Sequence, residues 1–161
     1  MGMEGVLCYA FRNDELLMLR KGVREDDPNS QLYTVSGGKI DPGETPIVAV
    51  KREVSQETNY RIEPVFAGTV FFNNKNRTFD DWPNPEDYFV FVYTARNPKG
   101  KMKGTKEGEP MWIPRASVPL KPQHAGDLYL WEWVQEGKNF AGVITHKGKE
   151  IDKERTRVEF F

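Results

Sequence analysis

Glu53 and Glu57, two glutamates four residues apart, are the residues whose spacing most directly suggests chemistry. In a helix, side chains at this spacing lie one above the other on the same face. Two such carboxylates repel each other, but a divalent cation between them reverses the effect, because carboxylate oxygens are the ligands that Mg²⁺ and Mn²⁺ prefer. An acidic pair alone is also typical of an ordinary solvated helix face, so its surroundings decide between the two interpretations.

The glutamate pair belongs to a longer pattern that begins in a glycine-rich turn. The stretch "SGGKIDPGET" (36–45) leads without a gap into "PIVAVKREVSQET" (46–58), which has the apolar periodicity of a helix. At ordinary residue abundances, its five fixed positions recur by chance roughly a few times in ten thousand chains. The pattern therefore favours a functional site over an ordinary solvated helix face. Its fixed positions are Gly38, Glu44, Arg52, Glu53 and Glu57.

The stretch "GGKIDPGETPIVAVKREVSQETNY" resembles the signature of the MutT-like Nudix hydrolases, which cleave nucleoside diphosphates linked to another group. The family pattern is G-x5-E-x7-R-E-U-x-E-E-x-G-U, where U is a bulky apolar residue. Gln56 departs from it where the family has Glu, and Asn59 departs where it has Gly. The matching positions are Gly38, Glu44, Arg52, Glu53, Val54, Glu57 and, as the last bulky residue, Tyr60.

The resemblance implies a Mg²⁺ (or Mn²⁺) site and a water that attacks phosphorus. Glu53 would orient or deprotonate this water, and Arg52 would brace the carboxylates through a contact with Glu44. Lys39 and the Gly38 backbone would contact the phosphates. The implied metal ligands are the Gly37 carbonyl, Glu53, Glu57, Gln56 and Glu107.

Two of these ligands carry particular expectations. Gln56 keeps an amide oxygen but has no charge, so we expect fewer or weaker metal sites than in the family pattern. Glu107 lies in "TKEGEPMWI", which resembles the segment where a further Glu approaches the metal in nucleoside-triphosphate-cleaving members. A ligand and an exposed loop acid are both open interpretations of Glu107.

The C-terminal part, from "WIPRASVPLKPQHAGDLYLWEWVQEG" onward, is similar to hydrolases of oxidised purine nucleoside triphosphates. There, an acid before the second helix reads the base edge, and Asp127 occupies that place, although Gly126 stands where a second acid is common. Asp127 is equally a natural helix-start residue. Thr34 falls at a base-contacting position, Phe72 would stack on the base or belong to the core, and His124 would line the same pocket.

We expect hydrolysis of a nucleoside triphosphate to its monophosphate and pyrophosphate, with an oxidised purine such as 8-oxo-dGTP as the specific candidate. The alternatives are a pyrophosphatase for another nucleoside diphosphate derivative, such as ADP-ribose or a dinucleotide, and a catalytically weak nucleotide-binding or regulatory protein. Gln56 motivates the last alternative.

The 161-residue composition limits the other classes of function. A net charge of −1 argues against duplex nucleic acid as a partner. No apolar run has the length of a membrane span, and no signal peptide opens the chain, so we expect a cytoplasmic protein that binds a small nucleotide. Residues 1–161 are expected to form a single domain, as a monomer or homodimer. The one cysteine, Cys8, is expected to be buried in a strand.

The expected elements position the glycine turn and the acidic helix within a β-rich fold. Thr45 would cap the helix from Pro46, with Ile47, Val50 and Val54 as its buried stripe. A second helix is expected at 125–137. The resemblance implies an α/β fold, a Nudix-type α/β/α sandwich with a mixed central sheet. Strands are expected at 5–11, 15–21, 31–35, 64–72, 87–95, 111–113, 139–145 and 157–161.

Overall fold

The computed structural model describes residues 3–22, 31–74, 87–106, 108–148 and 150–161. The first half of the described chain contains β1 (Met3–Arg12), β2 (Glu15–Lys21), β3 (Tyr33–Thr34), β4 (Ser36–Lys39), α1 (Pro46–Thr58), β5 (Val65–Asn73) and β6 (Tyr88–Arg96). The second half contains β7 (Gly108–Pro114), η1 (Arg115–Leu120), α2 (Ala125–Gln135), β8 (Phe140–Lys147), β9 (Glu150–Ile151), η2 (Lys153–Arg155) and β10 (Arg157–Phe160).

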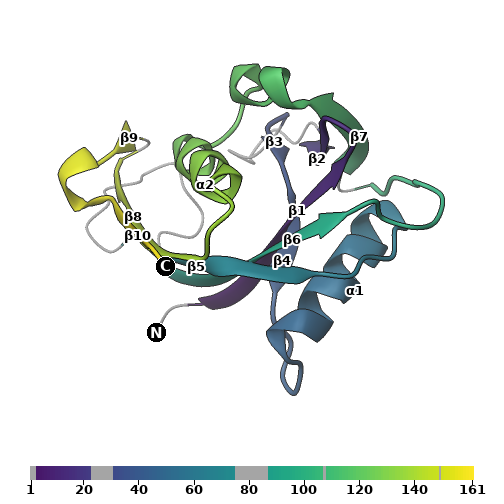
Figure 1. Ribbon diagram of the computed structural model, residues 1–161, viewed down its shortest axis with the longest axis horizontal. Helices are drawn as coiled ribbons and strands as arrows, with labels where there is room; N and C mark the ends of the chain where they lie inside the picture. Colours follow the sequence, from purple (N-terminus) through teal and green to yellow (C-terminus); the bar gives the residue numbers. More distant parts are fainter. Residues whose placement is uncertain (1–2, 23–30, 75–86, 107, 149) are drawn as a thin grey trace.

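The strands form a mixed sheet in the order β10-β8-β5-β6-β1-β2-β3, with β4 paired to β1, β7 to β2 and β9 to β8. β1 runs parallel to β6, and β5 runs parallel to β8, whereas the other pairs are antiparallel. Figure 1 shows α1 on one side of the central strands and α2 on the other. This arrangement confirms the predicted mixed sheet with helices packed on its faces.

Two cores follow from the alternation of side chains along β1. Val6, Cys8 and Ala10 face α1 and belong to the core around Val50 and Val54. The intervening Tyr9 and Phe11 face the opposite way and pack with Leu130 and Trp131 of α2. The predicted burial of Cys8 is confirmed, and burial raises the pKa of its thiol to about 12.

The bounds of α1 follow local rules in its sequence. The Thr45 side chain caps the helix by accepting from the Val48 N–H at 3.3 Å, and Pro46 occupies the first turn. At the other end, Asn59 adopts a left-handed conformation with φ of 65°, and its N–H donates to the Ser55 carbonyl. Asn is one of the few residues that adopt this conformation at low cost, so it substitutes for glycine at the helix end.

The buried stripe of α1 differs in part from the prediction. Val50 and Val54 are fully buried, as expected, but Ile47 is 42% exposed, so its predicted burial is wrong. Ala49 and Thr58 are buried instead. The buried stripe therefore begins at Ala49, two residues later than the apolar periodicity predicts.

Within the described residues, no helix is long and apolar enough to cross a membrane.

Candidate functional site

The glycine turn lies against the acidic face of α1, and the contact depends on the two glycines of β4. A Cβ at Gly38 would lie 2.5 Å from the Glu53 carboxylate, and one at Gly37 would lie 2.3 Å from the Val6 carbonyl oxygen. The Gly37 N–H donates to Glu57 Oε1 at 3.1 Å. Both carboxylates of α1 therefore lie against the backbone of β4, where a side chain at Gly38 would displace Glu53 and one at Gly37 would collide with β1.

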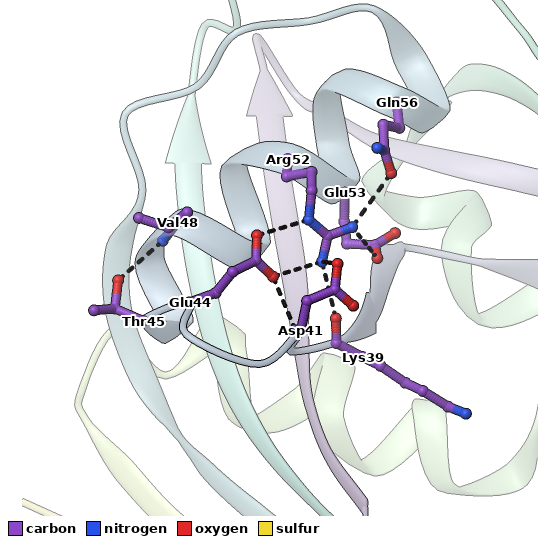
Figure 2. Close-up of polar contacts among 8 residues, drawn as sticks. All are labelled: Lys39, Asp41, Glu44, Thr45, Val48, Arg52, Glu53 and Gln56. Carbon is purple, nitrogen blue, oxygen red and sulfur yellow. Dashed lines mark hydrogen bonds and ion pairs between the residues drawn. The ribbon is translucent and has the colours of Figure 1, made fainter.

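Arg52 organises the acidic residues of the turn and helix (Figure 2). Its Nε and Nη2 donate to the two carboxylate oxygens of Glu44, and Nη1 donates to Glu53 Oε1, all at 2.8 Å. Nη2 also donates to the Lys39 carbonyl at 3.0 Å. Asp41 adds a looser ion pair at 3.4 Å. One guanidinium thus joins the turn to the helix and orients Glu53 by a charge-assisted hydrogen bond.

The charges in this network stabilise each other's ionised forms. Hydrogen bonds from Arg52, together with one from the Asp41 N–H, lower the pKa of Glu44 from 4.5 to about 2. The same contacts with Glu44 and Glu53 raise the pKa of Arg52 further above its already high value. Glu44 therefore stays a carboxylate, and Arg52 stays a cation, throughout the physiological pH range.

Glu53 and Glu57 fit a Mg²⁺ or Mn²⁺ ion whose remaining ligands are waters and substrate phosphates. The Glu53 side chain is 17% exposed, and Glu57 is 8% exposed, so both are largely shielded from water. No group of three or more His, Cys, Asp or Glu side chains that could hold a metal occurs among the described residues. A pair of carboxylates suffices for Mg²⁺ when waters and substrate phosphates complete its octahedron.

Two other predicted ligands lie differently. Gln56 is exposed, and its Oε1 accepts a hydrogen bond from Arg52 Nη1 at 3.3 Å (Figure 2). The amide oxygen therefore contacts the positively charged guanidinium of Arg52. Glu107 lies outside the described residues, and its role stays a prediction.

A cavity of about 410 Å³ lies beside this turn, between the sheet and the start of α2. It brings together the five residues predicted to contact substrate from β3, β4, β5 and α2, and His124 lines it as well. Gly38 belongs both to the cavity and to the acidic site, because its backbone lines the cavity and its Cα faces the Glu53 carboxylate. The five predicted residues are Thr34, Gly38, Lys39, Phe72 and Asp127.

Asp127 has the most perturbed carboxyl in this cavity. Burial raises its pKa from 3.8 to about 7. Near neutral pH this side chain therefore exists both as a hydrogen-bond donor and as a charged acceptor.

Sequence reasoning missed Asn74 and His146, which also line the cavity. Asn74 directly follows β5, and His146 lies near the end of β8. These strands are parallel, with Asn73 opposite Thr145, so polar residues at their ends meet at one edge of the sheet. The sequence signal that could have identified Asn74 and His146 was a polar residue at the end of each of two apolar strands.

Comparison with known proteins gives a family and several relatives. Residues 1–134 match the model of the NUDIX domain family. The 8-oxo-dGDP phosphatase NUDT18 of Mus musculus is 30% identical over 152 residues, which cover 87% of this chain and 42% of the relative. The oxidized purine nucleoside triphosphate hydrolase of Danio rerio is 24% identical over 116 residues, 71% of this chain and 70% of the relative. The chain spans only 42% and 36% of the mouse and human NUDT18 proteins.

Solved structures share the fold. The MutT protein of Bacillus halodurans superposes with a TM-score of 0.77 at 22% identity, covering 98% of this chain and 97% of the other. The NUDIX domain of Shewanella oneidensis NrtR, solved with ADP ribose, gives 0.69 at 20% identity, covering 85% and 88%. At these identities the comparison shows the α/β/α arrangement alone, and it confirms the predicted fold class.

Proposed function

This chain belongs to the NUDIX domain family of hydrolases, and we propose that its substrate is a nucleoside triphosphate with an oxidised purine base, such as 8-oxo-dGTP. The products would be the nucleoside monophosphate and pyrophosphate. The observation that carries this proposal is the position of Gly38, which joins the cavity to the carboxylates of α1. A base in the cavity would extend its phosphates across the β4 backbone toward Glu53 and Glu57.

The donor set supports a divalent metal at this place. Glu53, Glu57 and the Gly37 carbonyl would hold Mg²⁺ or Mn²⁺, and Gln56 would hold a water or ligate weakly. When bound, the ion would neutralise phosphate charge and lower the pKa of a coordinated water. Glu107 stays a proposed additional ligand.

The chain's own groups would then orient the reaction. Glu53, fixed by Arg52, would orient or deprotonate the attacking water. Arg52 itself would act as a positioning residue, because its donors are directed to Glu44, Glu53 and the turn. The exposed Lys39 lines the cavity and would attract the phosphates.

The proposed base contacts come from the walls of the cavity. The ring of Phe72 would stack on the base, and Thr34 and Asp127 would hydrogen-bond to its edge. A half-buried carboxyl in a largely apolar cavity discriminates strongly between bases, because a base without the matching group leaves it unpaired.

A nucleoside diphosphate is the second candidate substrate. The observation that favours it is the 30% identity to a relative named 8-oxo-dGDP phosphatase. The same carboxylates would serve both substrates, and the length of the phosphate chain beyond the cavity would decide between them.

The test is phosphate and pyrophosphate release from a panel with Mg²⁺ and then with EDTA. The panel holds 8-oxo-dGTP, dGTP, 8-oxo-dGDP, ADP-ribose and a dinucleoside polyphosphate. Glu57→Gln is a matched control, because its amide oxygen can still accept from the Gly37 N–H while the charge is lost. We expect Mg²⁺-dependent release of pyrophosphate from 8-oxo-dGTP, reduced roughly a hundredfold or more in the variant.

The other outcomes separate the alternatives. Faster turnover of 8-oxo-dGDP, with release of phosphate, would assign the diphosphate activity, and preference for ADP-ribose or the dinucleotide would assign a different pyrophosphatase. Nucleotide binding without turnover of any panel member would refute the hydrolase and leave a binding or regulatory protein.

A further inference from the structure

The helix α1 covers only part of the sheet face on which it lies. It packs against β1, β4 and β7, toward one end of the sheet (Figure 1). Beyond it, Phe66, Phe71 and Phe89 of β5 and β6 are 41%, 38% and 38% exposed. Soluble monomers rarely expose large contiguous apolar surfaces without a use for them. We call this surface the aromatic face, and its residues are Phe66, Phe71, Phe89, Phe91 and Val143.

One row of paired residues crosses the aromatic face from β1 to β10. Glu4 lies beside Phe89, and Phe89 lies beside Phe71. Phe71 lies beside Val143, which in turn lies beside Arg157. Residues paired across neighbouring strands have their side chains on the same side of a sheet. The row therefore begins with an acid, ends with a base and is apolar between them.

The alternation of side chains along β1 shows that the row lies just outside the cover of α1. Val6, Cys8 and Ala10 face the helix. Glu4 is two positions before Val6, so its side chain has the same orientation. Val6 is 1% exposed, whereas Glu4 is exposed. The helix therefore stops shielding this face between these two residues.

The charges at the two ends of the row are exposed. Within the described part of the chain, the ion pairs involve neither Glu4 nor Arg157. The two side chains are separated by four strand spacings, roughly 19 Å, which is too far for them to pair with each other. Both charges are therefore available to a second molecule on this face.

We propose that the aromatic face is the interface of a symmetric homodimer, in which a second copy of this chain packs face to face on β5, β6 and β8. A two-fold axis parallel to the strands and passing over Phe71 reverses the row. Phe71 then meets its own counterpart, and Phe89 meets Val143 of the second copy. At both ends of the row, Glu4 of one copy meets Arg157 of the other.

The placement of the charges favours a second copy over an unrelated partner. Glu4 and Arg157 lie two strands to either side of Phe71, and they carry opposite charges. A two-fold interface requires this relation, because each residue on one side of the axis contacts its match from the other side. The net charge of −1 also gives two copies little long-range repulsion.

The size of the face suits such a dimer. The five strands of the row give a width of roughly 24 Å, and β5 and β6, each nine residues long, extend roughly 30 Å. The footprint is therefore up to about 700 Å², close to the roughly 800 Å² that each partner contributes to a stable complex. An apolar centre with charges at its rim is also the usual composition of an interface.

The first test is the oligomeric state of the whole chain, measured by sedimentation velocity over a range of concentrations. We expect a dimer for the wild type. Phe71→Arg places two like charges at the axis and should raise the dissociation constant of the dimer at least roughly a hundredfold. Leu120→Arg makes a similar change at a side chain that is 81% exposed outside the aromatic face, and it should leave the dimer unchanged.

The second test uses the charges at the rim. Glu4→Arg and Arg157→Glu each replace two attractive contacts by two repulsive ones, so each should weaken the dimer roughly tenfold at low salt. Mixing the two variants should restore dimers, because both contacts are attractive again in the mixed pair. Glu132→Arg, on the exposed side of α2 across the sheet, is the control and should dimerise like the wild type.

Two results would overturn the inference. One is a wild-type protein that stays monomeric at its highest soluble concentration, which would leave the face to a different partner. The other is a pair of rim variants that dimerise as well alone as together. The rim variants change exposed side chains, so they decide the question even if Phe71→Arg fails to fold. Neither test needs a nucleotide or a metal, and the result is therefore independent of the proposed function.

Discussion

Arg52 and Glu44 form a two-point contact in which both guanidinium donors, Nε and Nη2, lie 2.8 Å from the two carboxylate oxygens. The planar fork of arginine matches a carboxylate in this geometry, and a lysine has no equivalent. The remaining Nη1 donates to Glu53 at 2.8 Å. Glu44 thus fixes the guanidinium, and the guanidinium fixes the carboxylate that we propose as a metal ligand.

Arg52→Lys should raise the pKa of Glu44 from about 2 toward its ordinary 4.5, because the main cause of the depression is the hydrogen bond from the guanidinium. A depressed pKa stabilises the fold at pH values above the unfolded pKa, and this contribution is lost as the pH falls toward 2. Carbon NMR titration of the Glu44 carboxyl measures the shift directly. Turnover should fall roughly 10- to 100-fold, as for other groups that orient a metal ligand.

Arg20→Lys is the matched control for this variant, since Arg20 forms an exposed ion pair with Glu109 at 3.4 Å. It should leave both the Glu44 titration and the turnover unchanged. A Glu44 pKa that stays near 2 in Arg52→Lys would contradict the assigned cause.

Gln56→Glu should raise turnover and lower the Mg²⁺ concentration needed for half-maximal activity by roughly tenfold. The new carboxylate can keep the contact with Arg52 Nη1 and adds negative charge near Glu53. Without metal, the additional like charge should lower the melting temperature slightly, and Mg²⁺ should restore it. Metal titrations of turnover and thermal melts measure both effects.

Gln135→Glu makes the same chemical change at an exposed position of α2 and should leave the Mg²⁺ requirement of turnover unchanged. It also removes the hydrogen bond from Gln135 Nε2 to the Trp131 carbonyl at 3.1 Å, so any fall in its melting temperature should not be restored by Mg²⁺. If Gln56→Glu left the Mg²⁺ requirement as it is in the wild type, residue 56 would not lie near the metal.

Gly38→Ala should reduce turnover roughly a hundredfold with little loss of stability. Its new methyl group would meet the Glu53 carboxylate at 2.5 Å, and this flexible side-chain end can move aside at the cost of its position. Gly68→Ala is the contrasting variant, because its methyl group would meet the Phe140 carbonyl oxygen at 2.4 Å. Since backbone cannot move aside cheaply, we expect a loss of about 1–3 kcal/mol of unfolding free energy there.

Urea unfolding and turnover per folded molecule distinguish these two effects. Gly38→Ala should unfold near the wild-type urea concentration. Equal stability losses in both variants would show that Gly38 serves the fold rather than the position of Glu53.

Local rules made the glycine turn and α1 predictable from sequence. The cap at Thr45, the proline in the first turn and the left-handed Asn59 each act within a few residues, and the structure shows all three. The extent of burial was less predictable. Apolar periodicity identifies the face of a helix that turns inward but not how far along the helix the sheet reaches, which explains the exposed Ile47.

The Asn74–His146 contact lay beyond sequence reasoning for a different reason. The two residues are 72 positions apart and meet only because β5 and β8 pair in parallel. Parallel pairing joins strands that are far apart in the sequence, and the pattern of apolar and polar residues within either strand does not encode which strand becomes its neighbour. The family resemblance located the cavity through Thr34, Phe72 and Asp127, whereas the residues particular to this chain required the structure.

Asp127→Asn should change the pH dependence of stability, because burial raises the pKa of this carboxyl from 3.8 to about 7. Between these values the folded protein retains a proton that the unfolded chain has released, so the free energy of unfolding decreases as the pH rises. Asparagine carries no charge at any of these pH values. The variant should therefore gain stability relative to the wild type from pH 5 to pH 7, by at most roughly 1.4 kcal/mol per pH unit, and the gain should level off above pH 7.

Urea unfolding of both proteins at pH 5, 6, 7 and 8 tests this dependence, since the difference between them removes the contribution of every other titrating group. Asp14→Asn is the control, because it makes the same chemical change at a side chain that is 89% exposed. A stability difference for Asp127→Asn that stays constant from pH 5 to pH 8 would mean that the Asp127 carboxyl is already ionised in the folded protein. Its proposed contact with the base would then be that of a permanent acceptor.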